Sequence, residues 1–217
     1  MTPADPLREA LTLAGPAGAL EALLEGPGDP APPAIAVVCH PHPLHQGTML
    51  NKVVHTACRA LNELGLPTLR FNYRGVGASE GHYADGLGET DDALAAADWL
   101  ARRYPGAPLW LAGFSFGAVV AWRAASQRPV ARLVSIAPPV ERMADVIAGL
   151  RPACPWLVVQ GDADEVVACA GVRDYVARLV PPPELVVLPG VDHFFHGKLS
   201  LLKAVLQERL APGTPDR

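Results

Sequence analysis

One serine in this chain has the neighbours that a nucleophile requires. The segment GFSFG, residues 113–117, lies between a short apolar segment, residues 109–112, and a segment rich in alanine and valine, residues 115–127. A sharp strand-to-helix turn needs small residues two positions before and two after the serine, and it lifts the hydroxyl clear of the strand. We therefore expect Ser115 to act as a nucleophile, although a plain turn with Ser115 as helix cap would use the same residues.

A serine hydroxyl needs a base to take its proton and a third group to orient that base. Both types of residue occur after Ser115, in the second half of the sequence. The loop GDADEVV, residues 161–167, follows one predicted strand, and the loop PGVDHFFH, residues 189–196, follows the next. We expect His193 to be the base and Asp164 to orient it.

Each loop also offers a second candidate. Asp162 comes directly after the strand, whereas Asp164 lies deeper in the loop, so Asp162 is expected to form the turn or to act as a supporting acceptor. His193 is nearer to its strand than His196, which is expected to be a packed or hydrogen-bonded neighbour.

The oxyanion of an acyl-transfer reaction needs two donors. Phe116 is expected to give one main-chain N–H, at the start of a helix whose dipole favours negative charge. The other is expected from HPHPLHQG, residues 40–47, where the prolines lack an N–H and leave His42, Leu44 or a later residue. We favour His42. The histidines of this segment lack a carboxylate or cysteine at ligand spacing, so neither zinc nor any other cofactor is expected.

The elements that must position these residues alternate between short β-branched segments and longer amphipathic ones. This alternation predicts an α/β fold with a mostly parallel sheet and helices on both of its faces. Two apolar segments around GPAG, residues 15–18, predict an antiparallel hairpin at the sheet edge. The hairpin strands are predicted at residues 9–13 and 20–24, the other strands at 35–39, 67–73, 109–112, 131–136, 155–160 and 184–188, and the helices at 47–64, 89–103, 115–127, 166–180 and 199–210.

The length and composition favour one domain, residues 1–217, because 50% of the residues are apolar. Residues 137–153 have room for one short helix and not for a lid, so an open, shallow site is expected. The net charge of -4, without a basic run, argues against binding to nucleic acid or to a membrane surface. Without an apolar segment of about 18 residues or a signal-like N-terminus, we expect a cytoplasmic protein.

Two further patterns have ordinary interpretations. The cysteines, Cys39, Cys58, Cys154 and Cys169, lie far apart in the sequence and are expected to be reduced. The glycine-rich segment NYRGVGASEG, residues 72–81, lacks the lysine of a phosphate loop and the spacing of a dinucleotide site. It is expected to form a turn beside the site, with Arg74 in a salt bridge.

Several segments together resemble the small, cap-less α/β-hydrolases related to dienelactone hydrolase, in that group's order and over nearly all of the chain after residue 30. They are HPHPLHQGTMLNKVV (40–54), RFNYRGVGASEG (70–81), GFSFG (113–117), GDADEVV (161–167) and GVDHFFHG (190–197). The resemblance implies an eight-stranded sheet, a triad of Ser115, His193 and Asp164, and hydrolysis of an ester-type bond. Dienelactone hydrolase itself has a cysteine where this chain has Ser115, so dienelactone is not the expected substrate.

The expected reaction is hydrolysis of a small, neutral or weakly charged ester or thioester through an acyl-serine. The phenylalanines at 114, 116, 194 and 195 are expected near the site, as pocket lining or as core. The same triad would also serve a peptidase, an amidase or an acyltransferase, and a binding protein without catalysis is a third alternative. The edge hairpin leaves dimerisation open.

Overall fold

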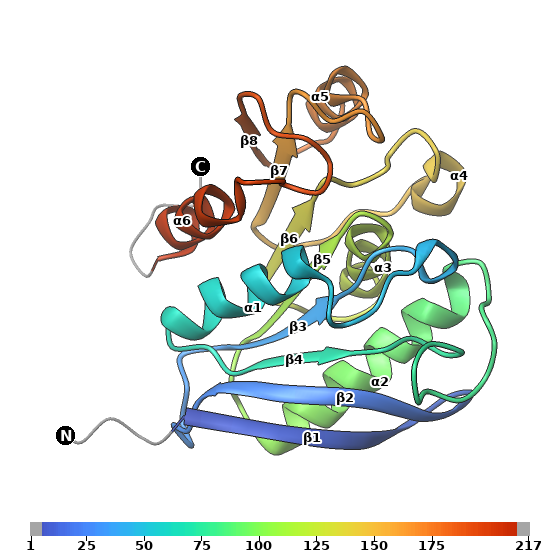
Figure 1. The fold of residues 1–217 in the computed structure, drawn as a ribbon, viewed down its shortest axis with the longest axis vertical. Helices are drawn as coiled ribbons and strands as arrows, with labels where there is room; N and C mark the ends of the chain where they lie inside the picture. The colour runs from blue at the N-terminus through green and yellow to red at the C-terminus, as the bar shows by residue number, and fades with distance from the viewer. Residues whose placement is uncertain (1–5, 212–217) are drawn as a thin grey trace.

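An eight-stranded sheet forms the centre of residues 6–211, the part of the chain that the computed structural model describes (Figure 1). Its strands are β1 (Pro6–Gly15), β2 (Gly18–Pro27), β3 (Ile35–Cys39), β4 (Thr68–Phe71), β5 (Leu109–Phe114), β6 (Arg132–Ile136), β7 (Trp156–Gly161) and β8 (Glu184–Leu188). They lie in the order β1-β2-β4-β3-β5-β6-β7-β8. The hairpin of β1 and β2 joins β4 antiparallel, and all other neighbouring strands are parallel.

Helices cover both faces of this sheet. They are α1 (Lys52–Glu63), α2 (Leu87–Arg103), α3 (Phe116–Ala125), α4 (Ala144–Ile147), α5 (Cys169–Ala177) and α6 (Leu199–Leu210). The apolar sides of α1 and α6 share one core cluster, and those of α2, α3 and α5 share the other. Figure 1 shows α1 and α2 on opposite sides of the sheet. None of the helices within residues 6–211 is both long and apolar enough to cross a membrane.

The central strands are apolar on both sides because both faces are covered. All residues of β3 are buried, and successive side chains of a strand point to opposite faces. Accordingly Ile35 and Val37 belong to the cluster under α2 and α3, whereas Ala36 and Val38 belong to the cluster under α1.

The predicted architecture is confirmed, including the edge hairpin and the mostly parallel sheet. The connection at residues 137–153 contains only α4, a single turn of helix, so no lid is built there. All four cysteines are free thiols, and burial raises the pKa of Cys39 and of Cys58 to about 12.

Several predicted boundaries were wrong, and for two of them the hydrogen bonds give the reason. The helix predicted from residue 47 begins at Lys52, because the His42 carbonyl accepts the N–H groups of His45 and Gly47 and turns the chain first. The helix predicted from residue 166 begins at Cys169. The strand predicted to residue 73 ends at Phe71, since the Tyr73 N–H donates to the ring of His40 instead of to the sheet.

The cap of α1 is Asn51, four residues beyond the predicted start of this helix at residue 47. Asn51 Oδ1 accepts the N–H groups of Val53 at 2.9 Å and Val54 at 3.4 Å. Asn51→Ala should therefore reduce the free energy of unfolding by about 1 kcal/mol, the usual cost of losing a helix cap. Thr48→Ala is the matched control, because Thr48 Oγ1 accepts only the Leu50 N–H in the exposed loop. Urea denaturation of both variants checks this order, and an equal or larger loss for Thr48→Ala would contradict it.

Candidate active site

Ser115 lies on a strained turn between β5 and α3. Its backbone has φ 55° and ψ -121°, in a region that side chains with a Cβ rarely adopt. The flanking glycines are required by contact: a Cβ on Gly113 would collide with the main chain of Gly117, and a Cβ on Gly117 would collide with the carbonyls of Cys39 and His40. The spacing of small residues in the sequence therefore has a direct steric cause.

The structure brings Ser115, His193 and Asp164 together from three separate loops. His193 Nε2 lies 3.1 Å from Ser115 Oγ, and His193 Nδ1 lies 2.8 Å from Asp164 Oδ2. A carboxylate accepts only, so we assign the proton to Nδ1, which leaves the lone pair of Nε2 facing the hydroxyl. This arrangement can remove the proton from Ser115 Oγ.

His193 is held in place by aromatic packing. The residue is 3% exposed, and its ring lies 5.1 Å from the ring of Phe114 at the end of β5 and 5.1 Å from that of Phe194. Ser115 itself is partly exposed, so a substrate can reach the hydroxyl while the imidazole stays buried.

Asp164 accepts hydrogen bonds at both carboxylate oxygens. Oδ1 accepts the N–H groups of Val166 at 2.9 Å and Val167 at 2.7 Å, and Oδ2 accepts from Gln160 Nε2 at 3.0 Å as well as from His193. Burial alone would raise the pKa of Asp164, but the bonds from His193 and from these main-chain groups outweigh it and lower the pKa. Asp164 is therefore a carboxylate that can stabilise a charged imidazole.

The alternative acid and base are bound elsewhere. Asp162 Oδ1 accepts the Gly190 N–H at 2.6 Å, which ties the loop after β7 to the loop after β8. The ring of His196 pairs with Asp192 at 2.8 Å, and its side chain is 76% exposed. Each has the supporting role that the sequence suggested for it.

The segments expected to supply the oxyanion donors are in contact. Phe116 is the first residue of α3, and its ring lies 4.7 Å from that of His42. The Leu44 N–H donates to His42 Nδ1 at 3.2 Å, so this alternative donor is engaged within the loop. Since Nδ1 accepts there, Nε2 carries the proton toward the hydroxyl of Tyr83 at 3.3 Å.

His40 also has both ring nitrogens engaged. Nδ1 lies 2.7 Å from the Pro41 carbonyl, and Nε2 accepts the Tyr73 N–H. Burial lowers the pKa of His40 to about 3, so the ring is neutral and links the loop after β3 to the loop after β4. The rings of His40 and His42 thus both contact the segment between β4 and α2.

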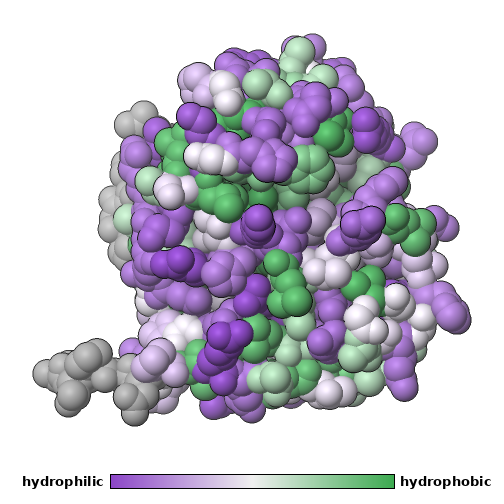
Figure 2. Space-filling view, viewed as in Figure 1, coloured by the Kyte–Doolittle hydropathy of each residue, from purple (hydrophilic) through white to green (hydrophobic). Residues whose placement is uncertain are grey.

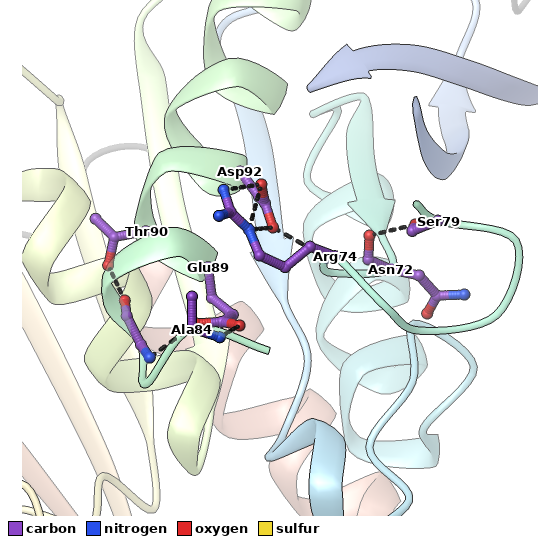
Figure 3. Close-up of polar contacts among 8 residues, drawn as sticks. Asn72, Arg74, Ser79, Ala84, Glu89, Thr90 and Asp92 are labelled. Carbon is purple, nitrogen blue, oxygen red and sulfur yellow. Dashed lines mark hydrogen bonds and ion pairs between the residues drawn. The ribbon is translucent and has the colours of Figure 1, made fainter. Parts of the chain in front are cut away.

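The glycine-rich loop after β4 is fastened to α2, as Figure 3 shows. Arg74 makes a bidentate ion pair with the buried Asp92, 2.7 Å from Nη2 to Oδ1, which confirms the expected salt bridge. Beside it, Glu89 accepts the N–H groups of Ala84 and Gly86 at the start of α2. The loop is therefore tied to the first turns of α2.

Sequence reasoning missed two residues of the site: Gln160, which touches Asp164, and Tyr83, which touches His42. Gln160 had a usable signal, because it is a polar residue at the end of an otherwise apolar strand.

Of the four phenylalanines considered, those at 114, 116 and 195 are buried, and Phe194 is 46% exposed beside His193. Phe194 is therefore the one available to a substrate.

The lowered pKa of Asp164 predicts a pH-dependent contribution to stability. The ionised group stabilises the folded state above its ordinary pKa of 3.8, and this contribution is lost as the pH falls through the lowered value. Asp164→Asn should cost about 1–3 kcal/mol near neutral pH, since an amide N–H would face the donors of His193 and Gln160. Urea unfolding across pH should show this difference shrinking below pH 3.8. Asp162→Asn, which keeps an oxygen for Gly190, should lose less, and a pH-independent difference for Asp164→Asn would contradict the assignment.

Comparison with known proteins shows the family of the chain. The model of the family described as serine aminopeptidase, S33, matches residues 32–153. An uncharacterised protein of Rickettsia prowazekii is 38% identical over 205 residues, which cover 90% of this chain and 86% of that protein.

Two solved structures have similar length and fold. An α/β serine hydrolase homologue from Coxiella burnetii is 46% identical with a TM-score of 0.89, covering 94% of this chain and 97% of its own. A protein of Xanthomonas campestris, described as an α/β serine hydrolase without lid, is 45% identical with a TM-score of 0.89, covering 96% and 97%. These similarities confirm the lid-less serine hydrolase resemblance. The chain belongs to the serine aminopeptidase S33 family of α/β-hydrolases.

Proposed function

We propose that this chain hydrolyses a small ester or thioester through an acyl-enzyme at Ser115. The observation that carries the proposal is the continuous hydrogen-bonded series from Ser115 Oγ through His193 to Asp164, with distances of 3.1 and 2.8 Å. Packing alone does not require these three side chains to meet at a strained turn.

In the first step, His193 Nε2 takes the proton of Ser115 as Oγ forms a bond to the substrate carbonyl carbon. The carbonyl electrons move to the oxygen, which the N–H groups of Phe116 and His42 hold. Asp164 stabilises the imidazolium. The tetrahedral intermediate collapses, and the leaving alcohol or thiol takes the proton from Nε2.

In the second step, water gives a proton to His193 Nε2 while its oxygen attacks the acyl carbon. The second tetrahedral intermediate expels Ser115 Oγ, which recovers its proton from the imidazolium, and the acid leaves. All proton transfers use the one ring nitrogen that faces Ser115. The side chains need no further reactant than water.

The surroundings of Ser115 favour an uncharged acyl substrate. Phe194 is 46% exposed beside His193, and Leu44 is 67% exposed two residues beyond His42. The short α4 leaves the serine open. These features favour a small substrate with an apolar acyl group over one that must be enclosed.

The family name makes an aminopeptidase the second candidate. Recognition of a free amino terminus requires a carboxylate directed at the substrate. The spare aspartates of the two triad loops are engaged, Asp162 with the Gly190 N–H and Asp192 with His196. The remaining carboxylate of these loops, Glu165, is exposed and forms no hydrogen bond with a described residue of the triad. Ester or thioester hydrolysis therefore has the better support.

Turnover of p-nitrophenyl esters, acyl-CoA thioesters and aminoacyl p-nitroanilides tests this order. We expect kcat/KM to be highest for the short-chain esters or thioesters. His193→Ala should reduce it by about a thousandfold or more, as removal of a triad base does. His196→Ala is the matched control and should keep most of the activity, because its exposed ring contacts Asp192 and not Ser115. Preference for the anilides, or equal losses in both histidine variants, would contradict the proposal.

A further inference from the structure

Basic side chains line a concavity beside α1 that includes no residue of the triad. The concavity has a volume of about 620 Å³, the size of a small-molecule site. Figure 2 shows hydrophilic side chains gathered over α1 on this face. Among the lining residues that lie within residues 6–211, six are basic and none is acidic, and we call this concavity the basic groove: Arg8, Lys52, His55, Arg59, Arg70 and Lys203.

Arg70 forms the floor of the basic groove and is almost completely buried. Its side chain is 4% exposed, with Nη2 2.7 Å from Glu25 and Nη1 donating to the Met49 carbonyl at 3.1 Å. Within residues 6–211, Arg70 Nε has no hydrogen-bond partner. Glu25 also pairs with Arg8 at 3.5 Å, so two guanidinium groups share one carboxylate. Arg8 and Arg70 together carry one positive charge more than Glu25 neutralises, and this excess favours a further anion beside them.

The outer part of the basic groove also has more positive than negative side chains. Lys203 lies 2.8 Å from Glu63, and Arg59 lies 3.6 Å from the same side chain. No ion pair of Lys52 is found among the described residues. Four of the five permanently charged cations around the basic groove therefore share two carboxylates, and Lys52 adds a fifth charge, although the whole chain has a net charge of -4. The positive charge is local.

His55 lies among these cations and responds to them. Burial lowers the pKa of His55, and the charges of Arg70, Arg59 and Arg8 lower it further, against the opposing effect of Glu25. The ring therefore stays neutral near physiological pH and can accept a hydrogen bond. It is also a reporter, because an anion bound in the basic groove would favour its protonated form.

We propose that the basic groove binds the phosphate groups of a small organic phosphate carrying at least two of them. A diphosphate matches the excess of cations better than a single carboxylate does, and guanidinium groups bind phosphate oxygens in pairs. The volume leaves room for the organic part of such a ligand. The described residues that line the basic groove include neither a member of the triad nor a residue of the loops 40–47 and 189–196. The ligand would therefore lie outside the triad.

Titration of the full chain with inorganic pyrophosphate and with ADP tests the proposal, with the His55 imidazole signals followed by NMR and sodium chloride added to match ionic strength. We expect saturable shifts with both ligands, and a higher pKa of His55 in the bound state. Lys52→Gln/Lys203→Gln should weaken binding by roughly tenfold, the effect of removing two exposed charge contacts. Tighter binding of ADP than of pyrophosphate would show that the organic part also contributes.

Arg102→Gln/Arg173→Gln is the matched control, because it removes two exposed cations outside the basic groove. It should bind both ligands as the unmodified chain does, and so should Ser115→Ala, which separates this site from the proposed hydrolysis. Absence of a saturable shift, or equal weakening in the control double variant, would overturn the proposal.

Discussion

The strained turn at Ser115 is the constraint on which the rest of the site depends. A positive φ at a residue with a Cβ is unfavourable, and it persists only where the surroundings fix it. The surroundings here are β5 and α3, whose close approach requires glycine at 113 and 117, and the carbonyls at the end of β3, which touch Gly117. The same contact that fixes the turn of Ser115 therefore also places the loop of His42 beside it.

The position of His193 beside Ser115 depends in turn on Asp164, at the far end of the triad. A buried carboxylate is costly unless its oxygens accept hydrogen bonds. Asp164 meets this requirement with two main-chain N–H groups and the amide of Gln160, which leaves one direction of Oδ2 for His193. The first residues of the loop after β7 thus hold Asp164 in place. For this reason α5 starts later than its apolar pattern suggested.

The parts of the site that the sequence predicted are those with local causes. The turn at Ser115 depends on residues within two positions of it, and the succession of strands and helices along the chain follows from apolar periodicity. The choice of Asp164 over Asp162 depended on its place in the loop, which is also a local property. In contrast, the Tyr83–His42 contact and the pairing of Arg70 with Glu25 join residues 41 and 45 positions apart, which no short pattern specifies. The basic groove also depends on contacts between distant residues, because its cations come from separate elements.

The central claim is that Ser115 is the nucleophile activated by His193. The most direct test is to treat the full chain with a fluorophosphonate, which reacts with activated serine hydroxyls, and to locate the adduct by mass spectrometry. The account predicts one adduct, on Ser115, in the unmodified chain and no labelling of Ser115→Ala. No labelling of the unmodified chain, or the same labelling in Ser115→Ala, would contradict it.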